Sequence, residues 1–342
     1  VLEYLYRKNA DIALIQETHL KQGDVARFQN KHYKLLASSS APNKTKGVCI
    51  LLKRKFYLTT TYSTSDENGR LALVTGSILN HKLIFISVYC PNEPDRDFFT
   101  YIANTLLEYN DYSIVLGSDF NAVVNPIFDK SHPDAVVNLS SSLLNTLIKD
   151  LNLIDLWRMQ NFDIRDYTFF SNRHKTFSRI DYVFVSPSLV SGDTSISIQP
   201  ILISDHSALL CSVDLPNLKN RAPRWRFNTS LLTNSTFLSL LKLQLKDFLD
   251  INANEDINPQ VLWETTKCFI RGFSISFSSM LAKTKRAQVS NLENQVESLQ
   301  NLQKLSRSDD QSTLLASLKE EYDAITLSKA EFILHRTRQK YY

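Results

Sequence analysis

The sequence has few glycines and no long apolar segment, and each shortage excludes a class of protein. Its 342 residues include seven glycines, too few for a fibrous or linker-rich chain. No apolar run approaches the length of roughly 20 residues that a membrane-spanning helix requires. Residues 1–8 do not show the basic and then apolar order of a secretory signal peptide. We therefore expect an intracellular protein, nuclear or cytoplasmic, without a membrane partner.

Cysteine is also scarce, with four residues at positions 49, 90, 211 and 268. None stands in a Cys-x-x-Cys or Cys/His spacing, which argues against a structural zinc site. Three of them lie inside apolar, strand-like runs. We therefore expect buried, reduced thiols, as is usual inside cells.

The net charge of +4 is unevenly divided along the chain. Residues 1–218 carry 21 basic and 22 acidic side chains, whereas residues 219–342 carry 18 basic and 13 acidic ones. The balance is thus −1 in the first part and +5 in the second. A basic tail would attract a polyanion such as nucleic acid, although a solvated helical face has a similar composition.

Short β-branched and aromatic runs separated by turn residues predict strands. We expect them over 12–16, 33–38, 47–52, 57–62, 71–78, 82–89, 113–117, 168–170, 179–186 and 207–213. Helical periodicity predicts helices over 1–9, 95–110 and 140–151. Many strands with a few helices between them indicate an α+β fold. We expect a four-layer α/β/β/α sandwich, two packed mixed sheets with outer helices, over residues 1–215.

The composition changes after two prolines, Pro216 and Pro223, and we place a linker over 216–228. Beyond it, over 229–342, the periodicity predicts an all-helical tail. Helices are expected over 229–251 and 259–282, and a helical hairpin or short coiled coil from 285 onward with a break at 306–312. A helical spacer that packs on itself or on a neighbour would show the same pattern.

Four acidic residues each lie at the edge of a short apolar run: Glu17, Asp119, Asp181 and Asp205. The last of them stands beside His206, between two strand-like runs. Hydrolysis of a phosphodiester requires a polarised phosphoryl oxygen, an activated water and stabilisation of the developing charge. Four carboxylates in this setting are what a metal-assisted phosphodiesterase needs.

These residues belong to five motifs in a fixed order: Gln16-Glu17-Thr18, Val88-Tyr89-Cys90-Pro91-Asn92, Gly117-Ser118-Asp119-Phe120-Asn121, Ser178-Arg179-Ile180-Asp181-Tyr182 and Ser204-Asp205-His206-Ser207. The order resembles the endonuclease/exonuclease/phosphatase superfamily over about residues 1–215. Local sequences at 15–20 and 167–171 look most like the apurinic-type endonuclease domain of LINE-type non-LTR retrotransposons. The segment 329–342 resembles the region that precedes the reverse transcriptase in such polyproteins.

The resemblance implies a Mg²⁺-dependent endonuclease, with Mn²⁺ as a substitute, that nicks DNA and leaves a 3′-hydroxyl for target-primed reverse transcription. DNA would be its partner, and element RNA a second partner through a region further downstream. Glu17 would be the main metal ligand, since Mg²⁺ prefers hard oxygen donors. Asp205 would either assist the metal or hold its loop.

The remaining site residues receive their roles from the same comparison. Asp119 would orient or deprotonate the attacking water, and Asn121 would hold the phosphate. His206 would lie against the scissile phosphate, with Asp181 fixing its tautomer. Tyr89 would donate its hydroxyl to the phosphate. Two further residues are expected at the substrate by the resemblance alone: Asn92 and Thr168.

A hairpin with a basic tip is expected between positions 168 and 181. Its tip carries Arg173, His174 and Lys175, which could meet DNA phosphates or a narrow minor groove. In the resembled family a hairpin here enters a DNA groove. A solvated turn explains the same residues equally well.

One departure from the family pattern concerns the start of the chain. The family normally opens with an asparagine-bearing strand, which has no counterpart here, so we expect a chain shortened at both ends. Three other functions stay open: a repair-type apurinic endonuclease, a phosphatase of lipids or inositol phosphates, and a catalytically impaired remnant that binds nucleic acid.

Overall fold

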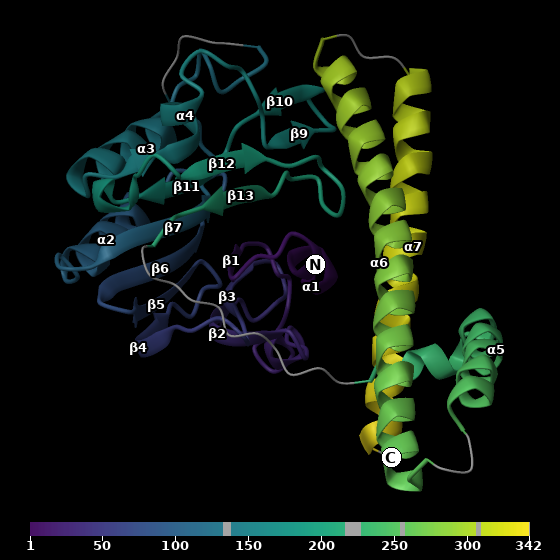
Figure 1. The fold of residues 1–342 in the computed structure, drawn as a ribbon. Coiled ribbons are helices and arrows are strands. Elements are labelled where there is room, and N and C mark those ends of the chain that lie inside the picture. The colour runs from purple at the N-terminus through teal and green to yellow at the C-terminus, as the bar shows by residue number, and fades with distance from the viewer. Residues whose placement is uncertain (133–137, 216–226, 254–256, 306–308, 342) are drawn as a thin grey trace. The chain divides into compact units, whose positions relative to one another are not determined.

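A computed structural model describes residues 1–132, 138–215, 227–253, 257–305 and 309–341 (Figure 1). The chain forms two compact units, one made of Val1–Leu218 with Val296–Tyr342, the other of Lys219–Gln295. Most of the expected linker, residues 216–226, lies outside the described residues. The division into domains over 1–215 and 229–342 stays a prediction.

The first unit contains a six-stranded mixed sheet. Its strands follow the order β4 (Thr59–Ser65), β5 (Leu71–Ile78), β6 (His81–Tyr89), β7 (Ser113–Asp119), β11 (Asp181–Val185) and β8 (Ile154–Asp155). The pair β6 and β7 is parallel, and the other neighbours are antiparallel. Both β5 and β6 are mostly apolar and are buried over most of their length, because both faces of the sheet are covered.

A second, three-stranded antiparallel sheet has the order β1 (Ile12–Ile15), β3 (Gly47–Lys53) and β2 (Tyr33–Ser40). Two further antiparallel pairs complete the strands of this unit. One is β9 (Phe169–Ser171) with β10 (Thr176–Ser178), and the other is β12 (Ser195–Ile198) with β13 (Leu209–Ser212).

Three hydrophobic clusters define the layers. One side of the six-stranded sheet packs on helices α2 (Arg96–Leu107) and α3 (Leu139–Asp150), around residues such as Ile86 and Ile102. The other side packs on the smaller sheet, around Val74 and Ile50. Helix α1 (Leu2–Arg7) covers the outer face of the smaller sheet. This arrangement confirms the expected α/β/β/α sandwich (Figure 1).

The sheets approach closely where β1 faces β7. A Cβ atom added to Gly117 would lie 2.8 Å from the Leu14 side chain, so a glycine is required at this position. Helices begin where the sequence offers caps. Asp95 accepts a hydrogen bond from Phe98 N, and Asn138 accepts one from Ser141 N.

Several short elements were not predicted from the sequence, among them β8, β12 and α4 (Leu156–Gln160). These three are two to five residues long, which is too short for a periodicity to show. The expected helix over 259–282 continues, because 283–305 has no proline or glycine to end it.

The tail consists of three α-helices in the described residues: α5 (Ser235–Asn252), α6 (Pro259–Leu305) and α7 (Asp309–Tyr341). This confirms a helical tail. None of the helices in the described part of the chain is apolar over a stretch long enough to cross a bilayer. All four cysteines are free. Cys49 and Cys90 are buried and Cys211 is half-buried, but Cys268 is exposed on α6, so the expectation of a buried thiol is wrong there.

A buried ion-pair network fixes the start of β11. The guanidinium of Arg179, 1 % exposed, donates to Asp129 from Nε at 2.9 Å and to Asp155 from Nη2 at 2.7 Å. Asp129 also accepts from Arg158 Nη2 at 2.7 Å. Each buried charge is therefore paired and hydrogen-bonded, as burial of a charge requires.

The network predicts a large loss of stability for Asp129→Asn. Removing this carboxylate leaves buried guanidinium charge uncompensated, which typically costs about 3–5 kcal/mol of unfolding free energy. Asp111→Asn is the matched control, because Asp111 forms an exposed ion pair with Lys82. Urea unfolding should show a lower midpoint for the first variant and no measurable change for the second. Equal midpoints would contradict the importance of the network.

Candidate active site

Three of the expected site residues lie in one row across the large sheet. Tyr89 ends β6, Asp119 ends β7 and Asp181 begins β11. Tyr89 is the Cα partner of Asp119, and Asp119 is the Cα partner of Asp181. Directly paired residues project to the same face of a sheet, so backbone pairing alone brings these side chains together.

Glu17 reaches the row from the smaller sheet. It follows β1 in the left-handed backbone region, at φ 51°, which a residue with a Cβ rarely adopts outside functional sites or turns. The end of β1 is held by Gln16, whose Nε2 donates to Ser87 Oγ at 2.9 Å and to Gly117 O at 3.0 Å. The Tyr89 hydroxyl donates a hydrogen bond to the Glu17 carboxylate.

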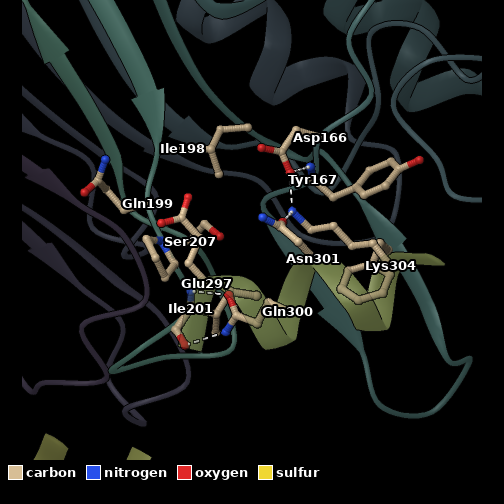
Figure 2. A pocket seen from close by; sticks show the side chains of 12 residues that line it. Asp166, Tyr167, Ile198, Gln199, Ile201, Ser207, Glu297, Gln300, Asn301 and Lys304 are labelled. Atoms are coloured by element: carbon tan, nitrogen blue, oxygen red, sulfur yellow. Dashed lines mark hydrogen bonds and ion pairs between the residues drawn. The ribbon is translucent and has the colours of Figure 1, made fainter. Parts of the chain in front are cut away.

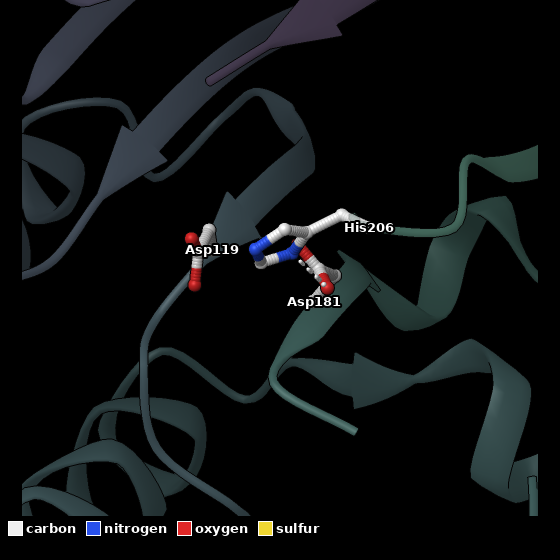
Figure 3. A group of neighbouring side chains, drawn as sticks. All are labelled: Asp119, Asp181 and His206. Atoms are coloured by element: carbon white, nitrogen blue, oxygen red, sulfur yellow. Dashed lines mark hydrogen bonds and ion pairs between the residues drawn. The ribbon is translucent and has the colours of Figure 1, made fainter. Parts of the chain in front are cut away.

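His206 comes from the loop between β12 and β13. Its Nδ1 lies 3.0 and 2.9 Å from the two carboxylate oxygens of Asp181. Figure 3 shows the imidazole between the two aspartates, with the other ring nitrogen facing Asp119. The ring also packs against Phe169, with 4.6 Å between ring centroids. The carboxylate of Asp181 thus holds the orientation of the imidazole.

The ionisable groups strongly influence one another. Burial raises the pKa of Asp119 well above its ordinary value, and the charge of Asp181 adds to this against the opposing charge of His206. Burial by itself would lower the pKa of His206, but the hydrogen bond and charge of Asp181 raise it to about 9. Burial and the hydrogen bond to Glu17 raise the pKa of Tyr89, so the phenol stays protonated at neutral pH.

The donor set fits a divalent metal ion. Asp119, Asp181 and His206 each offer one ligand atom, and these atoms lie within 4.8 Å of one another. Glu17 and Asp205 are not members of this group. The charge of Glu17 nevertheless acts on Asp119, and that of Asp205 acts on His206. Carboxylate oxygens are the donors that Mg²⁺ and Mn²⁺ favour.

The other expected residues occupy different positions. Asn121 lies next to the row, where its Nδ2 donates to Cys90 O at 2.8 Å. Its φ of 48° is one that asparagine tolerates. Asp205 is exposed and accepts from Ser204 Oγ at 3.2 Å. Asn92 is exposed in the loop between β6 and α2.

Thr168 is fully buried beside the site. Its Oγ1 accepts hydrogen bonds from Ile180 N at 3.1 Å and from Asp181 N at 3.2 Å. Its carbonyl oxygen accepts from Ser207 N at 2.6 Å. Thr168 therefore holds the backbone beside both Asp181 and His206.

The basic hairpin forms as expected from β9 and β10. Phe170 and Phe177 pack across it, with ring centroids 4.6 Å apart. At its tip the three expected side chains are exposed: Arg173, His174 and Lys175. Lys175 has a φ of 54° and donates its N–H to Ser171 O at 2.8 Å, which closes the turn.

The sequence did not indicate which residues hold the site segments in place through hydrogen bonds and ion pairs. Gln16, Ser87 and Arg179 lie in the predicted motifs or strands, but no role was predicted for them. A signal existed for Arg179, a charged residue directly before an apolar strand. No local signal marks Gln16 or Ser87, because their partners lie about 70 or more residues away.

A histidine between two aspartates, with a phenol and a glutamate beside it at the edge of two packed sheets, defines a metal-assisted hydrolase of phosphate esters. In agreement, residues 1–206 match the sequence profile of the endonuclease/exonuclease/phosphatase family, and the chain belongs to that family. The superfamily resemblance is thereby confirmed.

The similar proteins include a transposon protein. The chain is 25 % identical over 317 residues to the "Transposon TX1 uncharacterized 149 kDa protein" of Xenopus laevis, an alignment that covers 91 % of this chain and 24 % of that protein. The chain thus spans about a quarter of that relative's length.

Two solved structures are also similar. The AP endonuclease LMAP from Leishmania major has a TM-score of 0.51 and 13 % identity, covering 60 % of this chain and 79 % of that one, and this likeness concerns the fold. The endonuclease domain of TRAS1, a telomere-specific non-LTR retrotransposon, has a TM-score of 0.47 and 18 % identity, covering 63 % and 91 %.

The ion pair of His206 with Asp181 predicts a stability that falls as pH rises. Because the pKa of His206 is raised from 6.5 to about 9, its contribution is fully present below pH 6.5 and is lost as pH rises through 9. We expect the difference in unfolding free energy between wild type and His206→Gln to shrink by on the order of 2 kcal/mol between about pH 6 and pH 10 in metal-free buffer. Urea unfolding measures it.

The exposed His81 supplies the control for this measurement. His81→Gln should differ from wild type by the same small amount at every pH. A difference for His206→Gln that does not change with pH would contradict the predicted ion pair.

Proposed function

We propose that the chain is a DNA-nicking endonuclease that depends on Mg²⁺, with Mn²⁺ as a substitute. The observation that carries the proposal is the placement of His206 between Asp119 and Asp181, with its Nδ1 directed at Asp181. An imidazole oriented by one carboxylate and facing a second is suited to contact a phosphate while the second carboxylate acts on water.

Each residue then has a defined task. Asp119 orients the attacking water and accepts its proton, which suits a buried carboxylate whose pKa is raised above its ordinary value. The positive charge of His206 stabilises the charge that develops on the phosphate. Tyr89 donates its hydroxyl. The Asn121 amide carries a second N–H beyond the one directed at Cys90 and offers it to a phosphate oxygen.

A bound divalent cation supplies charge neutralisation at the phosphoryl oxygen. We assign it to Glu17 and Asp205, next to the group formed by Asp119, Asp181 and His206. Glu17 sits at the rim, with 36 % of its side chain exposed, and is held by Tyr89. One or two carboxylates are enough for Mg²⁺, which keeps several of its waters.

Two residues that were expected at the substrate receive different assignments. We assign Thr168 to positioning, because its hydroxyl and carbonyl are both used by the backbone around the site. Asn92 is exposed near the row and keeps its expected contact with DNA.

Two observations support a role in a transposable element: the order of the motifs, and the relative that is named a transposon protein. We infer that the nick leaves a 3′-hydroxyl that primes reverse transcription in a non-LTR retrotransposon. Element RNA would then reach the complex through another part of the element's protein.

Nicking of supercoiled plasmid tests the central proposal. We expect Mg²⁺-dependent conversion to open circles, stopped by a chelator. Asp119→Asn and His206→Asn should each lower the rate by roughly 10²–10⁴-fold, the usual contribution of a proton-transfer group. Asp193→Asn and His81→Asn, at exposed positions, are the matched controls and should nick at the wild-type rate.

The pattern of results separates the competing functions. Salt-sensitive binding without nicking at any Mg²⁺ concentration would favour an impaired, nucleic-acid-binding remnant. Strong preference for a duplex with an abasic site over an intact one would favour a repair-type endonuclease. Nicking that persists in Asp119→Asn would reject the assigned site.

The basic hairpin predicts a salt-dependent contribution to DNA binding. Replacing both Arg173 and Lys175 by alanine should lower the slope of log K against log[salt] by about 2, since each phosphate contact contributes about 0.9. Lys55 and Lys149, both exposed on other elements, form the matched double-alanine control. Fluorescence anisotropy over a salt series measures the slopes. Equal slopes for the two double variants would contradict a DNA contact of the hairpin and indicate that its tip faces solvent.

A further inference from the structure

The last turns of α6 contact the loop that carries His206. Gln300 is 8 % exposed, and its side-chain amide pairs with both backbone groups of Ile201. Ile201 N donates to Oε1 at 3.1 Å, and Nε2 donates to Ile201 O at 2.9 Å (Figure 2). Ile201 lies between β12 and β13, outside either ladder, so the glutamine amide satisfies buried backbone groups that a neighbouring strand would otherwise have to serve.

The same helical face reaches a second segment of the site. Lys304, four residues after Gln300, forms an ion pair with Asp166. Residues four apart face the same side of a helix, so one face of α6 makes both contacts. Asp166 lies two residues before Thr168, which holds the backbone of Asp181. Figure 2 shows both contacts at the small pocket between the helix and the loop.

The loop depends on such anchors. Gln199 N donates to Ala208 O at 2.9 Å and joins the two ends of the loop. Ser207 N donates to Thr168 O. Between Ile201 and Ser207 the residues at 203–205 are exposed. A segment with exposed side chains and few packed ones opens at low free energy unless its backbone is held. Gln300 holds its first half.

We propose that Gln300 is a positioning residue for the nicking reaction, because it fixes the loop that delivers His206 between Asp119 and Asp181. This inference rests on the proposed function. The end of α6 then belongs to the catalytic machinery, whereas its periodicity alone indicates only a spacer. A displacement of about 1 Å in a catalytic group can cost on the order of 100-fold in rate, so the backbone contact at Ile201 affects the chemistry five residues away.

Gln300→Met tests the proposal, since methionine keeps the length of the side chain and removes both hydrogen bonds. Gln303→Met, on the same part of α6, is the matched control, because Gln303 donates to Ser312 instead of to the loop. For Gln300→Met we expect kcat for plasmid nicking to fall about 10-fold with KM for DNA unchanged. Hydrogen exchange at the Ile201 amide should quicken about 10-fold. The control should match wild type in all three.

A second variant keeps the test valid where Gln300→Met lowers the yield of folded protein. Gln300→Asn keeps the donor and the acceptor of the amide but withdraws them by one methylene, so its kcat should fall between those of wild type and Gln300→Met. The thermal midpoint of each variant, followed by circular dichroism, shows that the chain is folded at the assay temperature.

The two readouts separate this inference from the proposed function. Wild-type kcat in a folded Gln300→Met chain overturns the positioning role and leaves the nuclease proposal intact. Unchanged exchange at Ile201 overturns it as well, independently of any activity. A wild-type chain that does not nick overturns the proposed function and the positioning role together.

Discussion

The buried guanidinium of Arg179 joins the segments from which the site is built. Besides its ion pairs with Asp129 and Asp155, it lies 5.2 Å from the ring centroid of Trp157 and 4.6 Å from that of Tyr182. Its backbone N–H donates to Asp129 O, and its carbonyl accepts from the Tyr182 hydroxyl. Asp181 follows two residues later, so the start of β11 cannot shift without exposing or unpairing a buried charge.

From this anchor the sheet supplies the rest of the geometry. The register of β6, β7 and β11 sets Tyr89, Asp119 and Asp181 side by side through backbone hydrogen bonds alone. His206 has less of this support, because it lies in the loop between β12 and β13, where its backbone forms an isolated bridge with Phe169 and the next residue, Ser207, donates to Thr168 O. Its position depends also on side chains: Asp181, Phe169 and the amide of Gln300 that holds the loop. The histidine is therefore the site residue most sensitive to changes outside the sheet.

The difference between strand ends and loops also explains which parts of the fold and of the site could be predicted from the sequence. Strand-like runs end beside Glu17 and at Asp119, and another begins at Asp181, so both the two-sheet fold and the carboxylates of the site were predictable. The motif at 204–207 identified the histidine. Its contact with Asp181 came from resemblance, and the structure has that contact.

The features that could not be predicted are mostly contacts between residues far apart in the sequence and very short strands. The hydrogen bond from Asp181 N to the Thr168 hydroxyl is one example, because nothing in a sequence distinguishes a buried threonine from an exposed one beside a short strand. Gln300 lies outside the apolar repeat of α6, where a polar residue is expected to face solvent. Its partner is 99 residues away, which no local pattern can indicate. The strand β12 alternates serine with isoleucine over only four residues.

Charge sets the final constraint on the proposed reaction. The four carboxylates of the site carry a total charge of −4 when all are ionised: Glu17, Asp119, Asp181 and Asp205. A protonated His206 adds +1, so a net charge of −3 remains where an anionic phosphodiester has to bind. Part of this repulsion is already visible in the raised pKa of Asp119. A divalent cation would lower that pKa again and reduce the net charge to −1. The remaining attraction must come from basic side chains outside the row, and the exposed Arg173 and Lys175 of the hairpin are suited to provide it, because a phosphate backbone extends well beyond the scissile bond.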